Sequence, residues 1–331
     1  GQWETFPQYL DYLGTRRYSL DIGAQMAHGA LRYYVMGERG AKDEDATADE
    51  LTVMEHLVQE AMEAGAMGFS TSRTIGHRAL DGVPVPGTFA AANELKAISR
   101  AMGRAGRGVF EAIPAGTVGS LEVFGGERSV PAEEARLFAE VSRAGNRPLT
   151  FTTVQIGESP DHWREVLDVV RKENAAGAQL RPQVAARSVT VMTSLSAYHA
   201  FMRRPTYMRE CAPLPLEQRV DFMRQPAIKE AILSERDQKD ERPGSMQNIG
   251  PMFVRGVNAL YPLREPLDYE PTRDRSVGAQ AKALGKDAES HLYDVLLEDG
   301  GRAFYAILGA NYAAGSLDVC REMLLDPNTV T

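Results

Sequence analysis

AMEAGAMGFSTS, residues 61–72, is the stretch that decides the fold. It begins with the end of an amphipathic helix, passes through Gly65 and finishes in a short apolar run that predicts a buried strand. Glycine tolerates the left-handed conformation that commonly ends a helix. A helix followed within a few residues by a buried strand indicates an α/β protein with a parallel sheet.

The helix before Gly65 carries signals at its start and along its length. Thr47 and Glu50 have the spacing of a capping box, which satisfies backbone N–H groups at a helix start. Over residues 50–64 the apolar side chains recur at helical spacing. The predicted inward face consists of Leu51, Met54, Leu57, Val58, Ala61 and Met62.

The same order recurs through the first half of the chain. Each predicted helix tends to end in an Ala-Gly pair, at residues 64–65, 105–106, 144–145 and 176–177, and a β-rich run follows. This alternation predicts parallel strands with helices outside. The expected strands cover 19–26, 66–72, 108–113, 148–154 and 180–185, and the expected helices cover 50–64, 89–106, 131–144 and 163–176.

A closed barrel and an open doubly wound sheet both fit this alternation, and two observations favour the barrel. No GxGxxG follows the first apolar run, so the dinucleotide fingerprint of the open sheet is missing. Polar residues also stand at the ends of several strands, where barrel enzymes collect their chemistry. These substrate-pocket candidates are His28, Ser72, Arg73, Glu111, Thr153, Gln155 and Gln183.

Three of these candidates also have simpler structural interpretations. Glu111 lies inside an apolar strand, so it is either a functional carboxylate or half of a structural ion pair. His28 is more simply interpreted as a buried histidine that fixes a loop by a hydrogen bond. Arg73 could hold a substrate carboxylate with its two-pronged guanidinium, although a surface or loop role is at least as simple.

The second half of the chain is less regular. Residues 198–251 are rich in Met, Arg and Pro and predict a helical insertion after the barrel units of residues 1–197. Residues 252–331 are expected to return to the barrel, with strands over 254–263 and 304–308 and helices over 276–297 and 317–325. The expected fold is therefore an incomplete (β/α) barrel with a helical insertion in its second half.

Composition narrows the classes of function. The 331 residues are 43% hydrophobic and carry a net charge of −8, which argues for a globular protein and against a nucleic-acid partner. Cys211 and Cys320 lack any CxxC spacing and are expected to be free thiols. No apolar run reaches membrane-spanning length, so we expect no membrane partner. The two free cysteines fit a reducing compartment, and we expect a cytoplasmic location. The sequence is silent on oligomeric state.

Three segments carry a resemblance to a known family. They are WETFPQYL at residues 3–10, HGALR at 28–32 followed by VMG at 35–37, and AMEAGAMGFST at 61–71. In this order and spacing they resemble the N-acyl-D-amino-acid deacylase branch of the amidohydrolase superfamily. The resemblance implies a TIM-type barrel joined to a small β-sandwich. It also implies a small-molecule partner, a substrate whose amide C–N bond is hydrolysed by water activated on zinc or another divalent metal.

The chain departs from the family pattern at each metal-binding position. It contains no His-x-His, with which the family's site begins, and the family's catalytic aspartate would lie beyond Thr331. Thr153 and Ile113 stand where family members have histidines, and neither side chain replaces imidazole as a ligand. No metal ligand is therefore assigned within the chain.

Two functional hypotheses follow from the resemblance. In the first, the chain is an internal piece of a deacylase-like hydrolase, without the β-sandwich and inactive alone. In the second, it is a degenerate amidohydrolase barrel that binds a small ligand without turnover. The acyl group, the amine portion and the stereochemical preference stay open in both.

Overall fold

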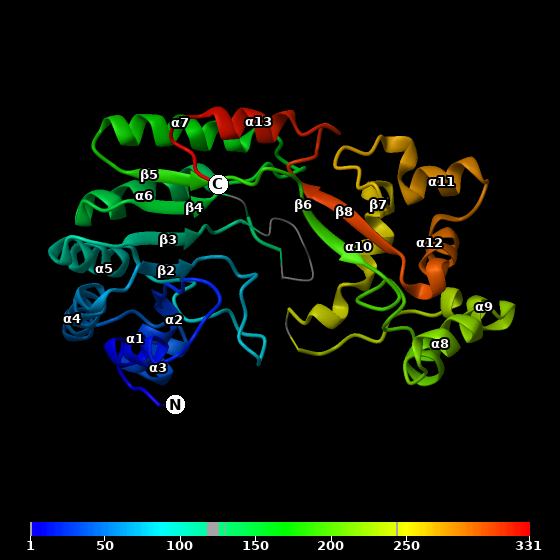
Figure 1. The fold of residues 1–331 in the computed structure, drawn as a ribbon, viewed down its shortest axis with the longest axis horizontal. Coiled ribbons are helices and arrows are strands. Elements are labelled where there is room, and N and C mark those ends of the chain that lie inside the picture. Colours follow the sequence, from blue (N-terminus) through cyan, green and yellow to red (C-terminus); the bar gives the residue numbers. More distant parts are fainter. Residues whose placement is uncertain (1, 118–125, 129, 243) are drawn as a thin grey trace. The chain divides into compact units, whose positions relative to one another are not determined.

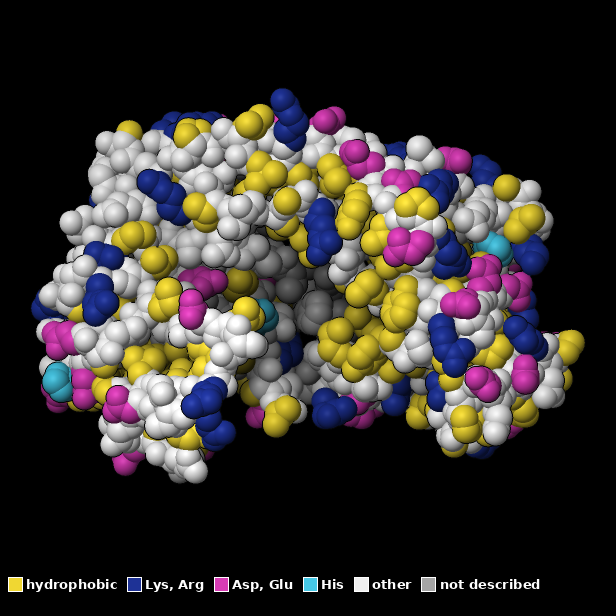
Figure 2. All heavy atoms as spheres, viewed as in Figure 1, with side chains coloured by type: hydrophobic (Ala, Val, Ile, Leu, Met, Phe, Trp, Pro, Cys, Tyr) yellow, Lys and Arg dark blue, Asp and Glu magenta, His cyan; other side chains and the backbone are white. Residues whose placement is uncertain are grey.

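A computed structural model describes residues 2–117, 126–128, 130–242 and 244–331 of the chain (Figure 1). The protein divides into two compact units. Unit 1 comprises residues 1–153, 161–184 and 324–331, and unit 2 comprises residues 154–160 and 185–323. On the face drawn in Figure 2, basic and acidic side chains are interspersed over both units.

Unit 1 contains a five-stranded parallel sheet whose strands lie side by side in sequence order (Figure 1). A parallel sheet with sequential strand order is the arrangement found in a (β/α) barrel. The α/β fold expected from the sequence is thereby confirmed. The strands are β1 (Gln25–Ala27), β2 (Gly68–Ser72), β3 (Val109–Ile113), β4 (Leu149–Thr152) and β5 (Leu180–Gln183).

Long helices connect successive strands and pack against one another. α4 packs against α5, α5 against α6 and α6 against α7. The buried core lies between these helices and the sheet, where the rings of Phe69 and Phe110 are 5.3 Å apart. The four helices are α4 (Ala48–Ala64), α5 (Ala92–Ala105), α6 (Pro131–Gly145) and α7 (His162–Ala175).

The predicted helix signals hold at one position and need correction at another. Thr47 and Glu50 form both hydrogen bonds of a capping box, and Gly65 ends α4 in the left-handed conformation with φ of 114°. Gly145, in contrast, belongs to α6, and Asn146 provides the left-handed end. A Cβ at Gly145 would collide with the carbonyl oxygen of Ser99, so this glycine allows the close approach of α5 to α6.

The N-terminal part of unit 1 differs from the sequence prediction. The first strand is only Gln25–Ala27, because Leu20 and Ile22 are exposed and form no strand ladder. The prediction also lacked three helices. They are α1 (Phe6–Gly14), α2 (His28–Met36) and α3 (Glu38–Ala41).

The last residues of the chain extend the parallel pattern. After α13 (Asp318–Leu325), Val330 forms a parallel bridge with Gln183 of β5. The Val330 N–H donates to Pro182 O at 2.9 Å, and the Val184 N–H donates to Val330 O at 2.9 Å. The far edge of β5 is thus paired with a further chain segment in the parallel direction.

Unit 2 contains a separate sheet of three antiparallel strands. Their order is β6 (Val189–Thr193), β8 (Phe304–Ala310) and β7 (Leu260–Leu263). Helices and short turns surround this sheet, including a π-helical turn at Tyr207–Cys211. The longer helices are α8 (Leu216–Met223), α9 (Pro226–Ser234), α10 (Gly250–Arg255), α11 (Val277–Ala283) and α12 (Ala288–Leu296).

This arrangement differs from the expected division of the chain at residues 197 and 251. Residues 252–323 belong to unit 2, and their strands pair antiparallel with each other instead of extending the parallel sheet. The expected strand over 254–263 is mostly helical before β7. The expected helix over 276–297 is two helices, separated at Gly285, where φ is 64°, with Asp287 capping the second.

Two expectations from composition can be compared with the structure. Cys211 and Cys320 are both buried free thiols, as predicted. Among the described residues, none of the helices combines the length and the hydrophobicity that crossing a bilayer requires.

Candidate functional site

The parallel sheet of unit 1 has two different faces. Phe69, Phe110 and Phe151 are buried in the core beneath the helices. Side chains alternate between the faces of a strand, so the residues between these phenylalanines point the other way. We call this second side the open face, because most of its side chains are partly exposed. It carries Ser70, Ser72, Glu111, Thr152 and Gln183.

A row of polar residues crosses the middle of the open face. Ser70 is paired in register with Glu111, Glu111 with Thr150, and Thr150 with Arg181. The Thr150 hydroxyl donates to Arg181 O at 2.8 Å. Four adjacent strands therefore present hydroxyl, carboxylate, hydroxyl and guanidinium groups in one line.

Glu111 is the distinctive member of this row. Its side chain is half-buried, and it forms no hydrogen bond or ion pair with any other residue that the structure describes. Removing a carboxylate from water without a partner is costly. Glu111 is therefore suited to meet a ligand, and the alternative of a structural ion pair finds no partner in the described part of the chain.

A second pair lies at the carboxyl end of β2. The Ser72 hydroxyl and His77 Nδ1 are 2.8 Å apart. His77 comes from the loop that follows the strand. The loop residue thus contacts a predicted pocket residue and places an imidazole beside the open face.

The two remaining candidates of unit 1 lie on neighbouring strands. The Thr153 N–H donates to Gln183 O at 2.9 Å, directly after β4. The Thr153 hydroxyl is buried without a hydrogen-bond partner among the described residues. The structure thus brings Thr153 and Gln183 together at the carboxyl ends of β4 and β5.

Arg73 is not available to a substrate carboxylate. Its guanidinium donates to both carboxylate oxygens of Glu134, at 2.8 and 3.1 Å, and to Ala90 O at 3.0 Å. Glu134 also accepts from the Ala115 N–H at 3.2 Å. Arg73 therefore ties the loop after β2 to α6, which supports its structural interpretation over the binding one.

His28 lies on the opposite side of the sheet from Glu111. Its Nδ1 is 2.8 Å from the Thr71 hydroxyl, and its Nε2 is 2.7 Å from Glu94 Oε1. Thr71 is the buried neighbour of Ser70 and Ser72 in β2, so it faces the helices. With both ring nitrogens occupied and 2% of its surface exposed, His28 is a core histidine, as in the simpler interpretation.

The contacts of His28 belong to a buried charged cluster. Arg32 Nη1 donates to both oxygens of Glu94 at 2.6 Å. Burial raises the pKa of Glu94, but the hydrogen bonds and charges of His28 and Arg32 outweigh it and hold the pKa below its ordinary value. Burial raises the pKa of Asp43, which lies 3.9 Å from Arg32 Nε and accepts from the Gly87 N–H.

Gln155 differs from the other candidates in belonging to unit 2. Its backbone N–H donates to the Asn311 side chain at 2.7 Å, and its side-chain oxygen accepts from the Ala313 N–H at 3.1 Å. Its amide nitrogen donates to Pro160 O. These bonds fix the segment after β8, which makes Gln155 a structural residue.

The donor set for a metal ion does not fit the described residues. No group of three or more His, Cys, Asp or Glu side chains converges anywhere in the described ranges. Both ring nitrogens of His28 are engaged by Thr71 and Glu94, and Glu111 belongs to no group of three such donors among the described residues.

Several contacts of the site could not be found from the sequence. Glu94 and Glu134 lie on helices, 66 and 61 residues from their partners His28 and Arg73. Glu127 accepts hydrogen bonds from the Thr74 hydroxyl and the Ile75 N–H, which anchors the loop after β2. No local pattern marks these glutamates as partners of the strand ends.

Comparison with known proteins adds a structural relative. No family model and no curated protein matches the sequence. A solved structure of N-acyl-D-glutamate deacylase from Bordetella bronchiseptica, complexed with zinc and a phosphonate mimic of the tetrahedral intermediate, superposes with a TM-score of 0.50. The match covers 98% of this chain and 50% of the deacylase chain at 14% identity.

The chain shares the fold of that deacylase. It spans about half of the deacylase's length, and the low identity makes this a likeness of fold alone. A structure of D-aminoacylase, described with a binuclear metal centre, matches the same share of both chains with a TM-score of 0.48 and 17% identity.

Proposed function

We propose that this chain forms part of a hydrolase of the amidohydrolase type, which cleaves the amide C–N bond of an N-acyl amino acid. The fold shared with N-acyl-D-glutamate deacylase supports this proposal. The three sequence segments that resemble the deacylase branch are a second line of support. All three lie in unit 1, which contains the parallel sheet.

The observation that carries the proposal is the carboxylate of Glu111 on the open face, which has no partner among the described residues. Amide hydrolysis needs a group that accepts a proton or holds the substrate N–H while water attacks the carbonyl. Glu111 can accept such a hydrogen bond, and Ser70 and Thr150 flank it in the same row. Ser72 and His77 offer a hydroxyl and an imidazole for the polar end of the same substrate.

A divalent metal cofactor is supported only by the related deacylase structure. The zinc in the deacylase structure supports a divalent metal for the complete enzyme. The described residues of this chain do not supply its ligands. The residues of this chain therefore have the role of binding and orienting substrate, and we propose no catalytic acid or base among them other than Glu111.

A second function is favoured by the lack of a converging metal-donor set among the residues that the structure describes. A barrel that binds an N-acyl amino acid without cleaving it needs the open face but no metal ligands. The two functions predict the same ligand and differ in turnover. They are separated by measuring product release and metal content on the same protein.

The test uses the complete gene product, with its native flanking sequence. It is incubated with N-acetyl-D-glutamate and with other N-acetyl amino acids, and released amine is measured. Glu111→Gln is expected to lower kcat/KM by about 10²- to 10⁴-fold, the range of a lost proton-transfer group. The control Glu133→Gln removes an exposed carboxylate of α6 and is expected to leave the rate unchanged.

Three outcomes would count against parts of the proposal. Full activity of Glu111→Gln would remove Glu111 from the reaction. Binding of the amides without released amine, and without bound metal, would favour the binding barrel. Neither binding nor hydrolysis of any N-acyl amino acid would refute the substrate class.

A further inference from the structure

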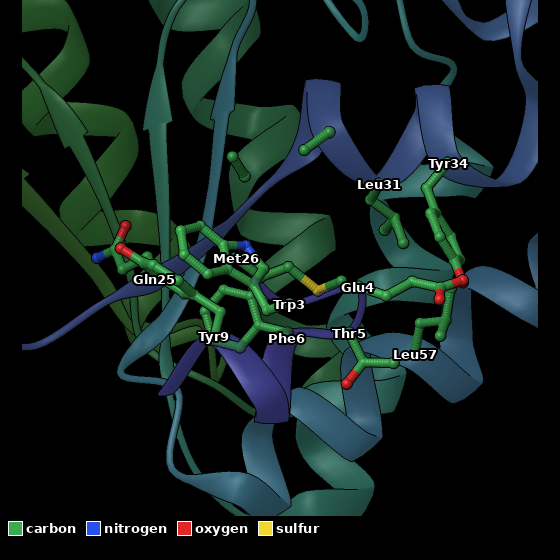
Figure 3. A pocket seen from close by; sticks show the side chains of 12 residues that line it. Trp3, Glu4, Thr5, Phe6, Tyr9, Gln25, Met26, Leu31, Tyr34 and Leu57 are labelled. Carbon is green, nitrogen blue, oxygen red and sulfur yellow. The ribbon is translucent and has the colours of Figure 1, made fainter. Parts of the chain in front are cut away.

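A pocket of unit 1 lies beside β1, the edge strand of the parallel sheet. Its volume is about 310 Å³, within the range of small-ligand sites, and it lies among α1, β1, α2 and α4 (Figure 3). None of the candidate site residues lines it. Its lining consists of Trp3, Glu4, Thr5, Phe6, Tyr9, Gln25, Met26, Ala27, Ala30, Leu31, Tyr34 and Leu57.

One end of the pocket is aromatic. Figure 3 shows Trp3, Phe6 and Tyr9 gathered on one side of Met26. The rings of Trp3 and Tyr9 lie 5.0 Å apart, and those of Phe6 and Tyr9 lie 5.7 Å apart. Phe6 and Tyr9 lie on α1, whose start is fixed by a capping box between Thr5 and Gln8, and Trp3 precedes that box.

The other end carries a carboxylate. Figure 3 shows the Glu4 side chain extending to Tyr34, whose hydroxyl donates to Glu4 Oε1 at 3.4 Å. The Glu4 backbone N–H donates to Gln8 Oε1 at 2.8 Å, which anchors the residue at the start of α1. Glu4 forms no ion pair within the described ranges, and no Lys, Arg or His lines the pocket.

We propose that this pocket binds a small organic ammonium ion with an apolar body. The π faces of Trp, Tyr and Phe attract cations, and a carboxylate beside them adds a charge of the required sign. Leu31, Leu57 and Met26 provide the apolar surface for the body of the ligand. The carboxylate of Glu4 repels an anionic ligand. A neutral apolar ligand would gain no charge attraction from it.

A neighbouring contact illustrates the same attraction. The guanidinium of Arg16 lies over the ring of Tyr12, 4.8 Å from its centroid. The ring of Tyr12 is itself 4.8 Å from that of Trp3. Arg16 does not line the pocket, so an external ammonium ion would be the cation at Trp3 and Tyr9.

The probe for the test is benzyltrimethylammonium chloride, with benzyl alcohol as the neutral counterpart and sodium benzoate as the anionic one. Binding is followed by titration calorimetry at low salt and by quenching of Trp3 fluorescence. The other tryptophan, Trp163, is buried in α7 and serves as an internal reference. We expect the cation to bind at least tenfold more tightly than benzyl alcohol, and benzoate not to bind.

Variants then assign the effect to the pocket. Glu4→Gln and Trp3→Leu are each expected to weaken binding of the cation by about tenfold. The matched control is Glu38→Gln. Glu38 is also exposed and accepts from a tyrosine hydroxyl, that of Tyr33 at 3.5 Å, but it does not line the pocket. It is expected to bind like the wild type.

Several results would overturn the proposal. Equal affinity for the cation and benzyl alcohol would mean an apolar pocket with no preference for charge. Equal losses in Glu4→Gln and Glu38→Gln would mean a general charge effect. Absence of binding of the cation to the wild type would exclude the site. None of these results depends on hydrolytic activity, so this proposal is tested independently of the proposed function.

Discussion

Two carboxylates on opposite sides of the parallel sheet have opposite surroundings. Glu94 lies on the helix side, is 2% exposed, and is held by His28 and Arg32. Glu111 lies on the open face, is half-buried, and has no partner in the described part of the chain. Full burial requires a carboxylate to be paired, whereas partial exposure permits an unpaired one. The comparison separates a charge that holds the fold from one that is free to meet a ligand.

The largest expected effect comes from breaking the paired side. Arg32→Met removes the guanidinium that binds both oxygens of Glu94 and leaves a buried carboxylate with His28 alone. Removing one partner of a buried pair costs about 3–5 kcal/mol of unfolding free energy. Urea unfolding followed by circular dichroism measures the loss. A loss below about 1 kcal/mol would mean that water reaches Glu94 and that the two sides of the sheet differ little.

A smaller loss is expected at Gly87, which packs on the same cluster. Its φ is 98°, and a Cβ there would lie 2.6 Å from His28 Nδ1. Gly87→Ala is therefore expected to lower the unfolding free energy by about 1–3 kcal/mol.

Gly177→Ala is the control for backbone strain. Gly177 has φ of 92° with nothing within 4 Å of an added Cβ, so an alanine there introduces backbone strain without a steric clash. The difference between the two variants isolates the contact with His28. Equal losses in both would show that the ring of His28 moves aside freely.

The pH dependence of stability separates the two carboxylates further. The pKa of Glu94 is lower in the folded protein than in the unfolded chain, so the unfolded state binds its proton more readily. The stabilisation is therefore fully present above the unfolded pKa, about 4.3, and is lost as the pH falls through the folded pKa. Unfolding midpoints between pH 7 and pH 3 should fall more steeply in the wild type than in Glu94→Gln. Parallel curves would contradict the role of Glu94.

Sequence reasoning predicted the parallel half of the fold well because its signals are local. The capping box at Thr47 and the stop at Gly65 each lie within a few residues of the feature they mark. Pairing direction is not local. Residues 189–193 have an ordinary strand pattern, but their partner strand begins at Phe304 and runs antiparallel, which no short-range pattern encodes.

The candidate site followed the same rule. Glu111 was predicted from its own strand, since a carboxylate among apolar residues is visible locally. The structural roles of His28 and Arg73 depend on Glu94 and Glu134, which lie on helices 66 and 61 residues away. Which polar strand-end residues are free and which are paired therefore required the tertiary structure.

The smallest effect on stability is expected on the open face. Glu111→Leu replaces a half-buried carboxylate, partnerless among the described residues, with an apolar side chain. The change is expected to leave the unfolding free energy unchanged or to raise it by up to about 1 kcal/mol. Binding of N-acyl amino acids to the complete protein should fall in the same variant. Urea midpoints and ligand titration on one preparation give both values.

A stability loss above about 2 kcal/mol would mean that Glu111 has a structural partner, and the two sides of the sheet would then be alike. Unchanged stability with lost binding would instead mean that the open face keeps a carboxylate the fold does not need, which is the property expected of a residue retained for its ligand.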